Sequence, residues 1–306
     1  MFNQFRSLAL AIQEKFNKFD PSVKSRFVDD NILNSHPPIF IIGSPRAGST
    51  LLFQVLCSQF QLSYISNIMA AFPSMMIRML RYVPSVATGY TGQIRMSKYG
   101  YVPGLVSPNE SGKILAKWFE KSPNPDHDKY IRNTFAAITG LSGAPVVLKN
   151  QNRLTVNIDK LEAIFSNARY IAIERDPLYN AQSLLIARRE VLGNERSWFS
   201  AKPPGYERIL DRDPYYQVVW QVLALQEIVK EKSQTIPGQR FYDLDYEDFC
   251  NNPALHLRRI QKQFDLTWKP GSDPDGIKLT ASKKIKLAQH DWDKLEDAYR
   301  IIKESK

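Results

Sequence analysis

One segment of the sequence combines glycines, hydroxyls and a basic residue at a spacing that can bind phosphate. Gly43 and Gly48 are separated by four residues, among them Arg46, and Ser49 and Thr50 follow directly. A short apolar run typical of a buried strand precedes the segment, and a stretch with the apolar periodicity of a helix follows it. Backbone N–H groups at such a turn, aided by the helix N-terminus, can bind a phosphate group. A glycine-rich turn without a ligand is the alternative.

The same loop lacks the lysine that nucleotide triphosphatases use. Ser49 occupies the position of that lysine, which contacts the terminal phosphates during phosphoryl transfer. Its absence argues against an ATPase or a kinase. Arg46 is a cation inside the loop that could replace it, and Ser49 and Thr50 supply hydroxyl donors.

A second candidate phosphate site follows a later apolar run. Residues 168–173 lead into Arg175, Asp176 and Pro177, and Ser183 follows on the next expected helix. Proline is favoured in the first turn of a helix. A guanidinium at the end of a strand and a hydroxyl about two helical turns further on can converge on one phosphate group. By itself, the segment also fits an ordinary strand–helix junction with a surface arginine.

Together, these two segments resemble the sulfotransferase family. Residues 38–52 are similar to the 5′-phosphosulfate loop of enzymes whose sulfuryl donor is 3′-phosphoadenosine 5′-phosphosulfate, and residues 168–177 are similar to the strand that ends at the 3′-phosphate site. The family's loop pattern P-R-S-G-T-T is changed at Ala47, which removes a hydroxyl, and at Ser49, which keeps one. The resemblance implies that the donor is bound by Arg46, Ala47, Gly48, Ser49, Thr50, Leu51, Arg175 and Ser183.

Two weaker similarities add residues to this site. A short apolar run ends in Lys149 and resembles the family's strand whose lysine contacts the transferring group. With Arg46, this lysine is the expected electrophilic stabiliser; a salt-bridged lysine at a strand end is the alternative. The segment around Tyr246 is similar to a late family segment whose tyrosine approaches the adenine. The resemblance spans residues 38–266 and implies a single sulfotransferase domain over residues 1–306 with a P-loop-like fold.

The sequence lacks the catalytic bases that two branches of the family use. Cytosolic members use a histidine at a K-T-H segment, and the tyrosylprotein branch uses a glutamate, but residues 64–68, where that glutamate would fall, hold no carboxylate. We expect His36 to precede the first strand and His127 to lie in a polar loop. His256 and His290 are expected at exposed helix positions.

Glu110 is the candidate base instead. It ends a run without acidic residues that begins after Asp30. It also follows a loop at 82–107, rich in Gly, Pro, Tyr and Ser, that we expect to shape the acceptor site through aromatic residues such as Tyr90, Tyr99 and Tyr101. A partly desolvated carboxylate near an acceptor hydroxyl can act as a general base. The alternative is a first-turn helix residue favoured by the helix dipole.

The elements that must position these residues alternate between strands and helices. Strands are expected at 39–42, 62–65, 145–148, 169–173 and 241–244. Helices are expected at 49–60, 70–80, 111–120, 156–165, 178–191, 215–230, 254–264 and 291–303, with a helical extension at 1–30. This alternation predicts an α/β fold with a parallel central sheet flanked by helices. Residues 280–283, around Ser282, are expected to close over the donor.

Charge and composition exclude several classes of protein. The 41 Lys and Arg against 31 Asp and Glu give a net charge of +10, which alone would suit several polyanions. Basic residues do not form a stripe and no nucleic-acid motif is present, so we expect no nucleic-acid partner. The apolar runs are shorter than the ~20 residues of a membrane span. Cys57 and Cys250 have neither disulfide nor metal spacing, which favours the cytoplasm.

We therefore predict a metal-independent sulfotransferase that uses 3′-phosphoadenosine 5′-phosphosulfate and releases adenosine 3′,5′-bisphosphate. The acceptor is expected to be a hydroxyl, or as a second choice a nitrogen, of a small molecule or saccharide. Two alternatives stay open: a P-loop kinase-like protein, and a nucleotide-binding protein that has lost catalysis, which the absence of a standard base would explain. The sequence identifies neither the acceptor nor the oligomeric state.

Overall fold

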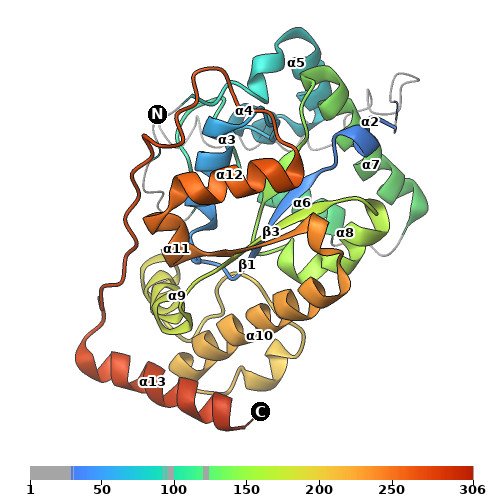
Figure 1. Cartoon of the computed structure of the whole chain (residues 1–306). Helices are drawn as coiled ribbons and strands as arrows, with labels where there is room; N and C mark the ends of the chain where they lie inside the picture. Colours follow the sequence, from blue (N-terminus) through green and yellow to red (C-terminus); the bar gives the residue numbers. More distant parts are fainter. Residues whose placement is uncertain (1–28, 30, 92–93, 95–99, 120–123, 306) are drawn as a thin grey trace, which may run out of the picture.

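A parallel four-stranded sheet forms the centre of the molecule (Figure 1). The computed structural model describes residues 29, 31–91, 94, 100–119 and 124–305. The strands are β1 (Ile39–Gly43), β2 (Val147–Lys149), β3 (Arg169–Glu174) and β4 (Phe241–Asp245). Their order across the sheet is β2-β1-β3-β4. The predicted α/β fold with a parallel central sheet is confirmed.

The strand register brings three loops to one edge of the sheet. Ile39 pairs with both Val147 and Arg169, and Gly43 lies opposite Ile173. Because the strands are parallel, the segments that follow β1, β2 and β3 leave the sheet on the same side. The chain also passes from β2 on one side of β1 to β3 on the other, and open α/β sheets bind ligands at such a switch point.

Helices cover both faces of the sheet, and alternate residues of β1 supply both cores. Phe40 and Ile42 pack in the cluster that α5, α6, α7 and α8 cover, whereas Ile39 and Ile41 pack in the cluster that α3, α11 and α12 cover. The whole of β1 is buried, as its continuous apolar run predicts. The helices are α2 (Ile32–Ser35), α3 (Ser49–Gln59), α4 (Asn67–Ala71), α5 (Met76–Tyr82), α6 (Gly112–Phe119), α7 (Pro125–Ser142), α8 (Ile158–Ile164), α9 (Pro177–Leu192), α10 (Pro214–Thr235), α11 (Tyr246–Asn251), α12 (Pro253–Phe264) and α13 (Gln289–Glu304).

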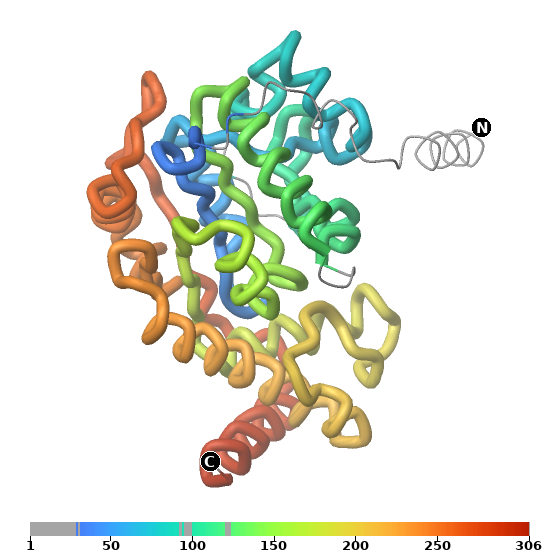
Figure 2. Tube along the Cα trace, turned by 90° about the vertical axis from the view of Figure 1, so that its right-hand side faces the viewer, coloured from blue at the N-terminus to red at the C-terminus, as the bar shows by residue number. Residues whose placement is uncertain are grey.

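A third apolar cluster joins α9, α10 and α13. Figure 2 shows α13 (red) at one end of the molecule beside α10 (orange). The chain reaches α13 from α12 through an extended segment, residues 265–288, that runs along the outside of the molecule in Figure 1. The packing of α13 therefore anchors the far end of a long segment that passes over the sheet edge.

Several expected elements differ in the structure. The strand expected at 62–65 is reduced to one bridge between Ser63 and Val146, because the next residue, Tyr64, turns away and bonds to Ala87. The helix expected at 70–80 is divided at Pro73, which begins a short 3-10 turn between α4 and α5. The expected extension at 1–30 lies outside the described residues apart from Asp29.

Helix α7 was not expected, because its first turn is polar. Asn124 caps it by accepting a hydrogen bond of 2.9 Å from the Asp126 amide, and Pro125 occupies the first helical position. His127, expected in a loop, is therefore a buried residue in the first turn of this helix. His256, expected on an exposed helix face, is also buried, between Tyr242 and Asp248.

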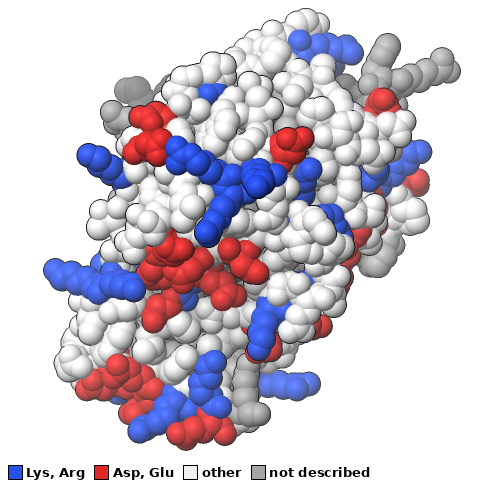
Figure 3. Space-filling view, viewed as in Figure 1, with Lys and Arg blue, Asp and Glu red and all other residues white. Residues whose placement is uncertain are grey.

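The net positive charge is distributed over the surface. Figure 3 shows basic and acidic side chains intermixed on one face, with several acidic side chains gathered near its centre. Such a pattern does not offer the continuous basic stripe that a nucleic-acid backbone would need on this face. Among the described residues, we find no helix with the length and apolar character needed to cross a membrane.

Candidate functional site

A cavity of about 490 Å³ opens at the sheet edge where β1, β2 and β3 end. Its walls come from the loop after β1, the ends of β2 and β3, helices α9 and α11, and the extended segment before α13. The residues predicted to bind the donor or to act in catalysis line it, apart from Ala47: Arg46, Gly48, Ser49, Thr50, Leu51, Glu110, Lys149, Arg175, Ser183 and Tyr246. Ala47 is fully buried inside the loop. The fold thus gathers segments that lie far apart in the sequence.

Side-chain hydrogen bonds hold the start of the loop after β1. The Thr155 hydroxyl accepts a hydrogen bond from the Gly43 amide at 3.0 Å and donates one to the Gly43 carbonyl at 2.8 Å. Gly48 has φ +94° and precedes α3, whose N-terminus has no side-chain cap. A Cβ on Gly48 would overlap the ring of Tyr246. Glycine therefore lets Tyr246 pack against the loop and leaves the helix N-terminus open to an anion.

The second candidate phosphate site meets the loop through Arg46 and Arg175. Arg46 Nε donates to Ser183 Oγ at 3.2 Å. Arg175 follows β3; its guanidinium donates to the Arg46 carbonyl at 3.4 Å and lies 5.0 Å from the centre of the Tyr246 ring. The carboxylate of Glu247 lies 3.7 Å from Arg175 Nε. Two positively charged side chains and one hydroxyl therefore face a single corner of the cavity.

The extended segment before α13 forms another wall of this corner. The Ser282 carbonyl accepts a hydrogen bond from Arg175, and Ser282 and Lys286 line the cavity. Gln182 on α9 holds the segment by donating to the Lys284 carbonyl at 3.1 Å and accepting from the Lys286 amide at 2.6 Å. The sequence pointed to Ser282 but not to Gln182, whose only signal was its position beside Ser183.

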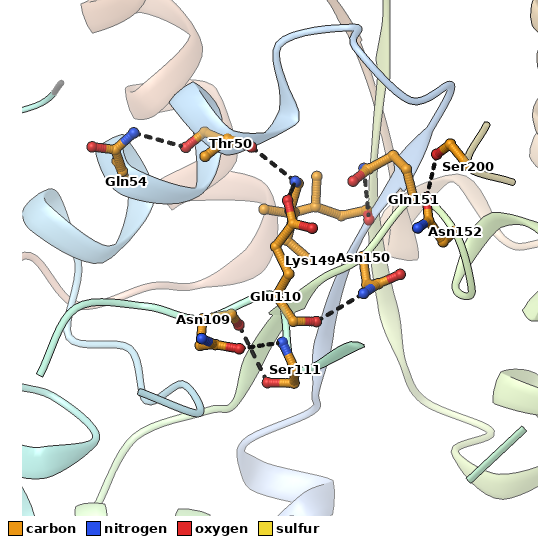
Figure 4. Close-up of polar contacts among 11 residues, drawn as sticks. Thr50, Gln54, Asn109, Glu110, Ser111, Lys149, Asn150, Gln151, Asn152 and Ser200 are labelled. Atoms are coloured by element: carbon orange, nitrogen blue, oxygen red, sulfur yellow. Dashed lines mark hydrogen bonds and ion pairs between the residues drawn. The ribbon is translucent and has the colours of Figure 1, made fainter. Parts of the chain in front are cut away.

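Lys149 connects the phosphate loop to Glu110. Its ammonium donates to Thr50 Oγ1 at 2.8 Å and forms an ion pair with the Glu110 carboxylate (Figure 4). The side chain of Lys149 is 6% exposed and that of Glu110 is 31% exposed. Burial lowers the pKa of Lys149, and the positive charge of Arg46 lowers it further, while Glu110 opposes the shift. The lysine therefore presents a poorly hydrated charge to the cavity.

Glu110 is held outside the helix that follows it. Helix α6 begins at Gly112, so the alternative of a first-turn helix residue is wrong. Asn150 donates to the Glu110 carbonyl at 3.0 Å, which ties its backbone to the end of β2. Gly100, with φ +86°, lies directly against the carboxylate, where a Cβ would overlap its atoms. The chain around Glu110 thus directs its carboxylate toward Lys149.

The cavity lining also contains residues that the sequence analysis missed. Gln151 and Asn152 follow Lys149 directly, and Phe199 and Ser200 come from the connection after α9. Ser200 donates a hydrogen bond to the side chain of Asn152 (Figure 4). The two residues after Lys149 could have been noticed from their position, whereas Phe199 and Ser200 carry no sequence signal.

Most of the other residues considered for catalysis or acceptor binding lie elsewhere. No histidine is among the described residues that line the cavity. Within the loop at 82–107, Tyr90 is buried and donates to Gln54 at 3.1 Å, so the expectation that it contacts an acceptor is wrong. Tyr101 is exposed outside the cavity lining, and Tyr99 lies outside the described residues. Of the loop residues that the structure describes, Gly100 lines the cavity.

The fold and the cavity define a class of protein. A parallel sheet whose first strand leads through a glycine-bearing loop into an uncapped helix N-terminus is a P-loop-like α/β protein. A model of the sulfotransferase family matches residues 37–270. The chain therefore belongs to the sulfotransferase family, as the resemblance of its two phosphate segments implies. A comparison with curated proteins found no match.

The chain is similar to several solved sulfotransferase structures. Sulfotransferase STF9 from Mycobacterium avium is 16% identical with a TM-score of 0.51, and the alignment covers 87% of this chain and 69% of that chain. Sulfotransferase STF1 from Mycobacterium tuberculosis H37Rv is 20% identical over 81% of this chain and 74% of that chain, with a TM-score of 0.48. The sulfotransferase domain from the Synechococcus PCC 7002 olefin synthase is 18% identical over 86% and 94%, with a TM-score of 0.43. At this identity, the similarity to the M. avium structure shows the fold.

Proposed function

We propose that this protein transfers a sulfuryl group from 3′-phosphoadenosine 5′-phosphosulfate to a hydroxyl, or as a second choice a nitrogen, of a small molecule or saccharide. One observation carries the proposal: two corners suited to anions open into the same cavity. One is the loop at the N-terminus of α3, and the other is formed by Arg175 and Ser183. A donor with a phosphosulfate at one end and a 3′-phosphate at the other has matching charges.

The charges of the second corner support the fit. The Arg46 side chain bonds to Ser183, the Arg175 guanidinium donates to the Arg46 carbonyl, and one carboxylate, that of Glu247, lies 3.7 Å from Arg175 Nε. The two guanidinium groups outnumber that carboxylate, and hydrogen bonds from a guanidinium to a phosphate are strong because both groups are charged. Tyr246, whose ring packs against both Gly48 and Arg175, offers a face for the adenine in this proposal.

The proposed mechanism assigns one task to each side chain. The donor supplies an activated sulfuryl group on a phosphate leaving group. Lys149 and Arg46 stabilise negative charge at the transferring and leaving oxygens, where a preorganised, poorly hydrated cation is most effective. Thr50 orients Lys149 by accepting its hydrogen bond. Glu110 accepts the proton of the acceptor hydroxyl, which requires the carboxylate to be within hydrogen-bond reach of that hydroxyl.

Ligand-dependent thermal stability tests the proposal. A ligand at 100 times its dissociation constant stabilises the folded state by about 2.7 kcal/mol, so adenosine 3′,5′-bisphosphate should raise Tm clearly. The absence of any shift with this nucleotide would count against a sulfotransferase donor site. A shift with ATP and Mg²⁺ alone would favour the P-loop kinase-like alternative. Nucleotide binding without transfer to any acceptor would favour a protein that has lost catalysis.

The cytoplasmic location stays a prediction.

A further inference from the structure

Ser111, the residue after the candidate base Glu110, has a backbone conformation that side-chain-bearing residues rarely adopt. Its φ is +55°, in the left-handed region that favours glycine, and the residue is buried. Asn109 supports this turn: its Oδ1 accepts a hydrogen bond from the Ser111 amide at 2.7 Å, and its carbonyl accepts one from Ser111 Oγ at 3.2 Å (Figure 4). A residue stays in such a conformation where its surroundings hold it there, and these conformations gather at functional sites.

The side chain of Asn109 is itself held by a second asparagine. Its Nδ2 donates to Asn67 Oδ1 at 2.6 Å. Asn67 Nδ2 in turn donates to the Val102 carbonyl at 2.7 Å and to the Gly104 carbonyl at 2.6 Å. The oxygen of each amide accepts and the nitrogen of each donates, so the partners define how both amides are oriented. The two asparagines therefore link the turn after Glu110 to the end of the loop at 82–107.

The same loop touches the carboxylate of Glu110. Gly100 lines the cavity, and a Cβ at this position would overlap the carboxylate atoms. The carboxylate at this place forms the ion pair with Lys149. The hydrogen bond between Asn67 and Asn109 joins the loop on one side of the carboxylate to the turn on the other. A change at either asparagine therefore reaches Glu110, although neither asparagine is among the described residues that line the cavity.

We propose that Asn67 and Asn109 are positioning residues that hold the Glu110 carboxylate against Lys149, so that the base and the cation beside it face the cavity together. The inference rests on the proposed sulfuryl transfer and adds two residues that act on it through Glu110. A general base works within hydrogen-bond reach of the proton that it removes, and a misplacement of about 1 Å can cost about 10²-fold in rate. Loss of Asn109 should therefore lower kcat and leave nucleotide binding, which uses other residues, intact.

The charge state of Lys149 reports this contact without any donor or acceptor. Burial lowers the pKa of Lys149, and Arg46 lowers it further, while Glu110 opposes the shift. Movement of the carboxylate away from the lysine should therefore lower this pKa more. Competitive acetylation of the full chain with trace acetic anhydride, followed by mass spectrometry, measures the uncharged fraction of each lysine against pH.

Asn109→Ala is the first variant to measure. We expect the acetylation midpoint of Lys149 to move to lower pH, toward the midpoint in Glu110→Gln, which lacks the carboxylate charge. We also expect kcat for transfer of radiolabelled sulfuryl to fall about tenfold or more. Asn109→Ser, whose hydroxyl can still accept from the Ser111 amide, should shift the midpoint less in the same direction, and it decides the question if Asn109→Ala does not fold.

Asn124 provides the matched control. Its side chain also accepts from the amide two residues further on, that of Asp126 at 2.9 Å, but it caps α7 and is not one of the described residues that line the cavity. Asn124→Ala should lower Tm through the lost cap and leave the Lys149 midpoint unchanged.

Two results would overturn the inference and leave the sulfotransferase assignment intact. One is a Lys149 midpoint that moves no further in Asn109→Ala than in Asn124→Ala, and the other is wild-type kcat in Asn109→Ala. Failure of the wild-type protein to bind adenosine 3′,5′-bisphosphate would instead remove the proposed function, and the Lys149 midpoints would still decide whether the asparagines position Glu110.

Discussion

Lys149 Nζ donates a hydrogen bond of 2.8 Å to Thr50 Oγ1. One residue ends β2 and the other lies in the first turn of α3, so the contact joins two neighbouring elements at the sheet edge. The same ammonium is paired with Glu110. The candidate stabiliser of the transferring group and the candidate base are thus in contact in the protein without ligand.

Replacing Lys149 by methionine should reduce transfer strongly. Loss of one preorganised group that stabilises developing charge typically costs about 10²–10³-fold in kcat. The measurement is steady-state transfer of radiolabelled sulfuryl, with nucleotide affinity measured by calorimetry as a check on folding. Lys232→Met, which removes an ion pair with Asp159 away from the cavity, should behave as wild type. Full activity in Lys149→Met would leave the lysine with a structural role.

The fall in the transfer rate at high pH should reflect loss of the proton of Lys149. Its pKa is lowered from the ordinary 10.5 by burial, so the charged form is lost at lower pH than for an exposed lysine and transfer should fall there. The same shift affects the free energy of unfolding. Between the lowered pKa and the ordinary value, the folded state binds fewer protons than the unfolded state, so this free energy should rise with pH as the buried lysine loses its charge.

Lys149→Arg separates Lys149 from other groups that titrate at high pH. Its guanidinium stays charged, so the alkaline limb should move to higher pH even if the maximal rate is lower. The measurement is kcat against pH for both proteins. If kcat falls at the same pH in both proteins, the titrating group is not Lys149.

Glu110→Gln should abolish turnover while donor binding is kept. Removing a general base costs about 10²–10⁴-fold, and the amide cannot accept the proton. Adenosine 3′,5′-bisphosphate should still raise Tm as in wild type. Glu207→Gln, the same change at an exposed position in a 3-10 turn, is the control. Unchanged turnover in Glu110→Gln would exclude this residue as the base.

Arg175 and Ser183 should determine the preference for a 3′-phosphate. We expect wild-type protein to bind adenosine 3′,5′-bisphosphate more tightly than adenosine 5′-monophosphate, because only the former has a 3′-phosphate that can contact Arg175 and Ser183. Arg175→Ala should narrow this preference by about 10–100-fold, since a hydrogen bond to a charged group contributes about 1.5–3 kcal/mol. Ser183→Ala should narrow it less. Competitive titration measures the ratio, and Arg300→Ala at an exposed site should leave it unchanged.

Gly48→Ala tests the packing of the loop against Tyr246. Both Gly48 (φ +94°) and Gly143 (φ +68°) have backbone conformations that alanine disfavours by about 1–2 kcal/mol. A Cβ meets the Tyr246 ring at Gly48 but meets nothing within 4 Å at Gly143. We therefore expect Gly143→Ala to lower Tm modestly with nucleotide affinity intact, and Gly48→Ala to lower both. Equal affinities in the two variants would show that the ring contact is unimportant for binding.

The sequence determined the features that depend on short stretches of chain. The apolar run at β1, the glycine spacing of the following loop and the strand–helix junction at Arg175 are local patterns, and they predicted the fold and the family. Helix α7 was not predicted because its polar first turn obscures the apolar periodicity. The strand predicted at 62–65 does not form because Tyr64 bonds to Ala87 instead of continuing the strand.

Only the tertiary structure decided which distant side chains share the cavity. The pairing of Lys149 with Glu110 and the hydrogen bonds of Gln182 to the segment before α13 both join residues of separate elements. No spacing along the chain encodes them, because side-chain proximity depends on how strands register and helices cross. The sequence thus located the candidate phosphate loop, while the folded structure placed the charged side chains around it.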